Sequence, residues 1–154
     1  MIYLDNAATT WPKPEAVYAE TDRFFRLSAA SPGRSSHRMA LTAGQAIERS
    51  RLSIARLFNA ADPCRIVFAF NATDALNTAL KGLLRPGDHV ITSSMEHNSV
   101  LRPLKALEKR GVITTRVRAS GTGWLDPLDV KRAITPMTRM IVTTHISNVT
   151  GTIQ

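Results

Sequence analysis

The 154-residue chain has a single cysteine and no long apolar segment, and both features limit what it can be. One cysteine, Cys64, excludes an internal disulfide and favours a reducing, cytoplasmic environment. No apolar run approaches the roughly 18 residues that a membrane-spanning helix needs, so no membrane partner is expected. The opening stretch, MIYLDNAATT, contains an acidic residue and no basic one, so it does not resemble a secretory signal.

Acidic residues are scarce relative to basic ones, and the formal net charge is +8. The basic residues gather in two segments, 34–56 and 102–118, which contain only Glu48 and Glu108 as acidic residues. A nucleic-acid-binding surface would be marked by interleaved aromatic residues or by a finger or RNP motif, and neither is found. We therefore expect solvated helix faces and no nucleic-acid partner, although a chain lacking the part that balances its charge would show the same excess.

The chain has no internal repeat or low-complexity tract, and 44% hydrophobic with 21% charged residues is typical of one globular domain. Apolar spacing predicts helices over 15–27 and 39–59, with a loop at 28–36 between them. Strands then alternate with helices. The predicted strands are 65–70, 89–93, 112–118 and 140–144, and the predicted helices are 72–84, 100–110 and 126–134.

This alternation predicts an α/β fold in three layers, with a mainly parallel sheet between helices. Ligands of such sheets bind at the carboxyl ends of the strands. Cys64 precedes the first predicted strand, at the end opposite this region, so we expect it to be structural.

Polar clusters follow three of the predicted strands: Asn71-Ala-Thr-Asp74, Glu96-His-Asn98 and His145-Ile-Ser-Asn148. The first opens a helix, where free N–H groups and the Thr73 hydroxyl would bind phosphate, although an ordinary N-cap would look the same. Taken singly, the two histidines could be core residues and Asn148 a turn residue. Together the clusters predict one pocket with a phosphate site, a flat imidazole and an amide.

Four stretches of the chain match motifs of a known family: YLDNAATTWPKPEAV at 3–17, SPGRSSHRMA at 31–40, NATDALNTALKGLLRPGDHVITSSMEHNSVLRPL at 71–104 and THISNVTGTIQ at 144–154. They resemble the class V aminotransferases, the pyridoxal phosphate enzymes that include cysteine desulfurases and selenocysteine lyases. The resemblance implies the incomplete large domain of a fold-type I pyridoxal phosphate-dependent transferase. On this basis 1–38 would form an amino-terminal arm, helix and substrate-entrance loop, and 39–154 the first portion of the cofactor-binding domain.

The resemblance also implies a role for each residue of the predicted pocket. His97 would stack on the pyridine ring of the cofactor and could transfer protons, which suits a flat group that titrates near neutrality. Thr73 and the backbone of Ala72 would bind the phosphate, and Asn148 would hydrogen-bond the ring hydroxyl. Glu96 would support the turn or an interface.

Asn6, Arg34 and His37 match family motifs near the substrate entrance. Arg34 could bind a carboxylate through two hydrogen bonds, although a solvated loop arginine is an equally good interpretation. The resemblance further implies a homodimer with the active site near the subunit interface, and it implies no metal.

Family members continue well beyond residue 154, and several of their functional groups belong to that later part. These are the aspartate that pairs with the pyridine nitrogen, the Schiff-base lysine, the sulfur-accepting cysteine and the arginine that holds the substrate carboxylate. The lysines present here fall on predicted helices or, for Lys13, between two prolines. We therefore expect weak binding of pyridoxal phosphate and no desulfurase activity from these residues alone.

Several alternatives remain for a chain with these features. It could be a truncated gene product, a proteolytic or engineered piece, or one half of a split enzyme with a complementary carboxyl-terminal chain. It could also be a non-catalytic module that binds phosphate compounds, or a partner through an open sheet edge.

Overall fold

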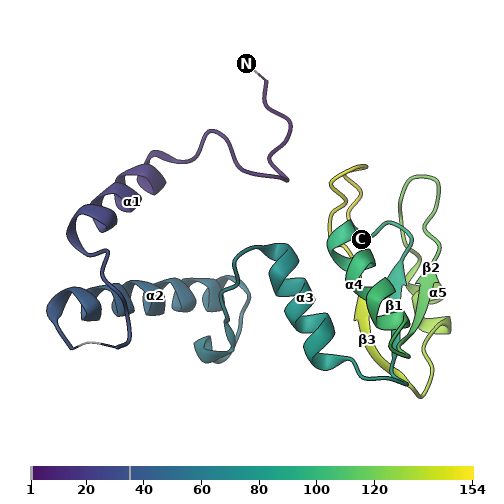
Figure 1. Ribbon diagram of the computed structural model, residues 1–154. Helices are drawn as coiled ribbons and strands as arrows, with labels where there is room; N and C mark the ends of the chain where they lie inside the picture. The colour runs from purple at the N-terminus through teal and green to yellow at the C-terminus, as the bar shows by residue number, and fades with distance from the viewer. Residues whose placement is uncertain (1, 35) are drawn as a thin grey trace. The chain divides into compact units, whose positions relative to one another are not determined.

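The computed structural model describes residues 2–34 and 36–154 (Figure 1). The chain divides into two compact units, Met1–Val67 and Phe68–Gln154. The boundary at 38/39 expected from the family resemblance stays a prediction.

The first unit is helical. Its helices are α1 (Glu15–Leu27) and α2 (Arg38–Leu57), followed by a short 3-10 helix, η1 (Pro63–Arg65). Both predicted helices are confirmed, with α2 ending two residues earlier than expected. The described part of the loop between them is irregular, as predicted.

The strand predicted over 65–70 is wrong. Arg65 ends η1, and the apolar residues after it form no strand: Val67 is 81% exposed and Phe70 95% exposed. A strand is stabilised by pairing its backbone groups with a neighbour, and no strand of the described chain pairs with this segment. An apolar, β-branched run was therefore not sufficient to predict a strand, and the sheet has three strands rather than four.

The second unit contains the parallel sheet that the alternation predicts. Its strands are β1 (His89–Ser93), β2 (Ile113–Val117) and β3 (Thr138–Val142), in the order β2-β1-β3. Both neighbours run parallel to β1. The central strand is buried along its whole length, which explains its uninterrupted apolar and small residues. β3 begins and ends two residues earlier than predicted.

Helices cover both faces of this sheet, which confirms the three-layer α/β fold. The helices are α3 (Ala72–Leu83), α4 (Asn98–Glu108) and α5 (Pro127–Arg132). Successive residues of β1 point to opposite faces. Val90 packs in a core with Leu80 of α3 and Leu104 of α4, whereas Ile91 packs in a second core against which Val130 of α5 rests.

A buried histidine at the amino end of β1 links the three strands. His89 is 3% exposed, and its ring nitrogens lie 2.8 Å from the hydroxyl oxygens of Thr138 on β3 and Thr115 on β2. One side chain on the central strand thus contacts both neighbouring strands. None of the helices in the described chain is both long and apolar enough to cross a membrane.

Candidate functional site

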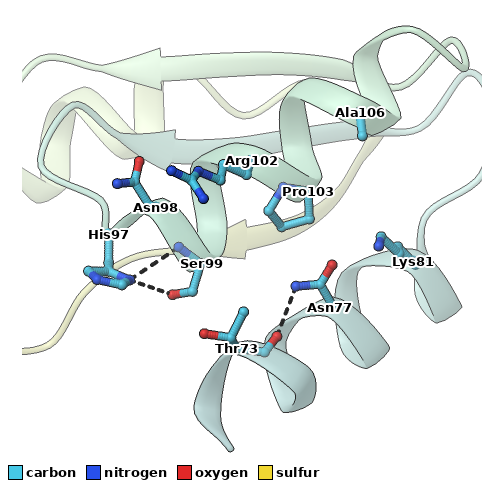
Figure 2. A pocket seen from close by; sticks show the side chains of 9 residues that line it. All are labelled: Thr73, Asn77, Lys81, His97, Asn98, Ser99, Arg102, Pro103 and Ala106. Atoms are coloured by element: carbon cyan, nitrogen blue, oxygen red, sulfur yellow. Dashed lines mark hydrogen bonds between the residues drawn. The ribbon is translucent and has the colours of Figure 1, made fainter. Parts of the chain in front are cut away.

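A cavity of about 330 Å³ lies between α3 and α4 (Figure 2). Thr73, Asn77 and Lys81 line it from α3, where their spacing of four residues puts them on one face of the helix. The other wall belongs to α4 and the residue before it. That wall consists of His97, Asn98, Ser99, Arg102, Pro103 and Ala106. The lining contains two cations and no acidic residue, so it favours an anionic ligand.

Three residues of the predicted polar clusters, Thr73, His97 and Asn98, line this cavity. Asn148 is not among its lining residues and sits in an exposed turn after β3. His145 is exposed as well, so it is not a core histidine. Because β1 and β3 are parallel, His97 and Asn148 still follow the same edge of the sheet. Their joint action on one ligand stays a prediction.

The amino terminus of α3 combines an N-cap with free donors. Asn71 is the N-cap, and its side-chain oxygen accepts a hydrogen bond from the backbone N–H of Asp74 at 2.9 Å. Ala72 and Thr73 are the first helical residues, so their N–H groups have no acceptor within the helix. The Thr73 side chain is exposed and points toward the cavity (Figure 2). The segment can therefore be both an ordinary N-cap, through Asn71, and a phosphate site, because the N–H groups of Ala72 and Thr73 are free to donate.

His97 is the N-cap of α4, with φ −69° and ψ 154°. Its Nδ1 accepts a hydrogen bond from the backbone N–H of Ser99 at 3.1 Å and lies 2.8 Å from the Ser99 hydroxyl. This cap explains why α4 begins two residues before the predicted position. The ring is exposed, so it is not filling space in a core.

Glu96 is buried beside this exposed histidine, at 8% exposure. Its Oε1 accepts hydrogen bonds from the Ser93 hydroxyl at 2.6 Å and from the backbone N–H of Thr144 at 2.9 Å. Glu96 thus supports the turn, as expected. It also joins the carboxyl end of β1 to the segment that follows β3.

The turn that carries Asn148 is anchored by hydrogen bonds. The buried Ser147 hydroxyl accepts from the backbone N–H groups of Val149 and Thr150, each at 3.2 Å. Gln154 then uses both ends of its amide: Nε2 donates to the Gly123 carbonyl at 2.7 Å, and Oε1 accepts from the Leu125 N–H at 2.8 Å. The polar turn is therefore held against the loop that follows β2.

The expected substrate-entrance residues lie in the first unit, where two have local structural roles. The Asn6 side-chain oxygen accepts from the Trp11 N–H at 3.1 Å. His37 is the N-cap of α2, and its Nδ1 accepts from the Ala40 N–H at 3.3 Å. Arg34 is exposed. Their roles toward a substrate stay predictions.

Sequence reasoning missed Asn77, Lys81 and Arg102 as cavity residues. Lys81 was set aside because it falls on a helix rather than at a strand end, yet it lines the same cavity as Thr73 and His97. The signal was available in the spacing of Thr73, Asn77 and Lys81, which predicts one helix face once Thr73 is placed at the site.

Cys64 lies in η1 and is exposed. A hydrogen bond with the Asp62 carboxylate, with added repulsion from its charge, raises the pKa of the Cys64 thiol. The thiol therefore stays protonated at neutral pH, which makes it a poor nucleophile.

The family of the chain follows from comparison with known proteins. The model of the family described as Aminotransferase class-V matches residues 2–154. The chain belongs to the class V aminotransferases. This confirms the family resemblance of its motifs.

Its relatives within that family include cysteine desulfurases. It is 36% identical over 154 residues to a probable cysteine desulfurase of Methanothermobacter thermautotrophicus, covering 99% of this chain and 38% of the relative. It is 35% identical over 157 residues to the cysteine desulfurase IscS of Neisseria gonorrhoeae, again covering 99% of this chain and 38% of the relative. The chain thus spans well under half the length of these relatives.

Solved structures agree with the sequence relatives. The apo structure of the cysteine desulfurase from Thermococcus onnurineus NA1 matches with a TM-score of 0.89 and 31% identity, over 99% of this chain and 38% of that chain. The structure of SspA in complex with cysteine matches with a TM-score of 0.88 and 34% identity, over 100% of this chain and 45% of that chain.

Proposed function

We propose that this chain is the amino-terminal part of a pyridoxal phosphate-dependent, cysteine desulfurase-like enzyme that removes sulfur or selenium from cysteine or selenocysteine. The observation that carries the proposal is that Thr73 and His97 line one cavity. One offers a hydroxyl at a helix amino terminus and the other an exposed flat ring. These are the two kinds of group that a phosphorylated aromatic cofactor needs.

The residues fit the cofactor in charge and in hydrogen-bonding capacity. Thr73 and the backbone N–H groups of Ala72 and Thr73 would hold the phosphate, and Lys81 and Arg102 add positive charge to the same cavity. His97 would stack on the ring and Asn148 would bind its hydroxyl. When bound, pyridoxal phosphate supplies an electron sink that stabilises negative charge on an amino-acid substrate.

Substrate recognition and assembly complete the proposal. Asn6, Arg34 and His37 would lie near the substrate, with Arg34 available for its carboxylate. We propose a homodimer in the cytoplasm, because many large apolar side chains of the described chain are exposed and exposed apolar surface favours association.

These 154 residues on their own are proposed to bind the cofactor weakly and to lack turnover. The lysines are Lys13, Lys81, Lys105, Lys109 and Lys131. Only Lys81 lines the cavity of Thr73 and His97, and it does so from the third turn of α3 rather than from a strand end.

Binding is tested by titrating the chain with pyridoxal 5′-phosphate and following its absorbance. Thr73→Val should weaken binding about tenfold, because a hydrogen bond to a charged group contributes roughly 1.5–3 kcal/mol. Thr78→Val, on the same helix but outside the cavity lining, is the matched control and should bind like the wild type. Equal binding by all three proteins would contradict the phosphate site.

Turnover is tested by borohydride reduction with peptide mapping, together with a sulfide assay on cysteine. We expect partial labelling spread over several lysines and no sulfide. If labelling has a preferred position, it is Lys81, so Lys81→Ala should reduce the label and Lys105→Ala should not. Stoichiometric labelling of one lysine with sulfide release would show that the chain is active alone.

A partner-binding module is the second candidate. It is favoured by the outer edges of β2 and β3, which pair with no strand in the described part of the chain. Such edges accept a strand from another protein. This candidate predicts that Thr73→Val leaves all binding properties unchanged.

A further inference from the structure

The hydrogen bonds around His97 define which of its ring nitrogens carries the proton. Nδ1 lies 3.1 Å from the backbone nitrogen of Ser99, in the geometry of an accepted hydrogen bond. A backbone N–H can only donate, so Nδ1 must present its lone pair. A neutral imidazole with an unprotonated Nδ1 carries its hydrogen on Nε2.

The Ser99 hydroxyl points to the same nitrogen. Its Oγ lies 2.8 Å from Nδ1, and Ser99 is only 9% exposed. The hydroxyl can donate to Nδ1 while the backbone N–H of the same residue also donates there. A hydrogen placed on Nδ1 would instead face the backbone N–H, which would break the helix cap. Two donors from one residue therefore converge on Nδ1.

The other ring nitrogen is left for a ligand. Nε2 of His97 has no hydrogen-bond partner in residues 2–34 and 36–154, and the ring is exposed. Figure 2 shows both hydrogen bonds running from one side of the ring to Ser99, with the rest of the ring turned away from that residue.

We propose that Ser99 is a positioning residue that holds His97 as the neutral Nε2–H tautomer. His97 then offers a hydrogen-bond donor to the ligand side, and a proton can be added at Nδ1 only if the cap of α4 is released. The chemical meaning of this arrangement rests on the proposed function, in which the His97 ring contacts the cofactor. The tautomer itself does not depend on that function.

His37 supplies a matched comparison within the same chain. It is also an N-cap, with φ −71° and ψ 154°, and its Nδ1 accepts from the Ala40 N–H at 3.3 Å. Met39 follows His37 at the position that Ser99 has after His97, and its side chain has no hydroxyl to donate. The contact is longer and single, so the bias toward Nε2–H should be weaker.

The test is nitrogen NMR of the histidine rings in the 154-residue chain, with His97 assigned through a His97→Gln variant. For His97 we expect an Nδ1 resonance typical of an unprotonated ring nitrogen and an Nε2 resonance typical of a protonated one. Ser99→Ala leaves the backbone N–H as the one donor to Nδ1, so the bias toward Nε2–H should weaken and both resonances should move part of the way toward the averaged positions of a mixed population. Ser99→Thr, which keeps the hydroxyl, should restore the wild-type positions.

Each result decides between defined alternatives. Protonation of His97 at Nδ1, or averaged positions in the wild type, would overturn the proposal. An unchanged spectrum in Ser99→Ala would show that the backbone cap acts without the hydroxyl, and Ser99 would lose the assigned role. Amide spectra of each variant verify the fold. No cofactor is added, so failure here is distinct from failure to bind pyridoxal 5′-phosphate.

Discussion

The two compact units use similar amphipathic helices but bury very different amounts of apolar side chain. In the second unit, Leu80 and Leu104 are at most 1% exposed, because α3 and α4 pack on the sheet. In the first unit, the buried residues of α2 are alanines and α1 has none, whereas Phe25 is 69% exposed and Leu57 78% exposed. Apolar periodicity therefore predicts a helix in both units, but burial depends on a packing partner.

This difference bears on function. The cavity with Thr73 and His97 lies in the unit that has a packed core, and that core holds the helices α3 and α4 at whose amino ends these two residues stand. The exposed apolar side chains of the first unit are the stronger reason to expect association with a second chain. Four sets of variants test the comparison, from the largest expected effect to the smallest.

Shortening a leucine side chain should show the difference in burial between the two units most clearly. Leu104→Ala should lower the free energy of unfolding by about 2–5 kcal/mol, because it removes a fully buried side chain. Leu57→Ala should change it by less than about 0.5 kcal/mol. Urea unfolding can follow each unit separately in Trp11→Phe and Trp124→Phe backgrounds, since Trp11 lies in the first unit and Trp124 in the second. Equal effects of the two variants would contradict the comparison.

His89→Ala should have the next largest effect. The variant removes the side-chain hydrogen bonds of His89 and leaves the hydroxyls of Thr115, Thr135 and Thr138 without this partner. We expect a loss of about 2–3 kcal/mol. His145→Ala is the control, because that side chain is exposed, and it should be nearly neutral. A neutral His89→Ala in urea unfolding would show that the three strands do not need this residue.

Glu96 tests how the strand ends are joined. Glu96→Ala removes the acceptor of the Ser93 hydroxyl and the Thr144 N–H, and should cost about 1–3 kcal/mol. Glu96→Gln keeps an acceptor oxygen and should cost less. The matched control is Glu108→Ala, which breaks the exposed ion pair with Arg116 and should cost under about 1 kcal/mol. Hydrogen exchange at the Thr144 amide should accelerate in Glu96→Ala alone.

The smallest expected effect is that of breaking an exposed ion pair on α1, between Glu20 and Arg23. A hydrogen bond from Arg23 lowers the pKa of Glu20, so this ion pair stabilises the helix above the ordinary glutamate pKa and is lost as the pH falls through the lowered value. Both side chains are exposed, so salt should screen the interaction. Far-ultraviolet circular dichroism of Glu20→Gln should show a slightly reduced pH dependence. A large stability change would mean that α1 is packed more tightly than its exposure indicates.

The sequence predicted the helices and the parallel arrangement of β1, β2 and β3 because each has its own local pattern. The start of α5 is an example of such a local pattern, because Asp126 caps the helix and Pro127 is its first residue. The prediction failed at 65–70, where strand formation depends on a neighbour that periodicity does not report. For Lys81 the spacing from Thr73 puts both residues on one face of α3, but that this face lines a cavity with α4 depends on how the two helices pack.

The central claim is that Thr73, His97 and Asn148 act on one phosphorylated ligand at the carboxyl edge of the sheet. The most direct measurement is amide NMR of the labelled chain during titration with pyridoxal 5′-phosphate. We expect shifts concentrated at 72–77, 97–102 and 145–149, with small shifts at the basic residues of 49–56. Shifts spread evenly over the basic surface, or confined to one of the three segments, would contradict the claim.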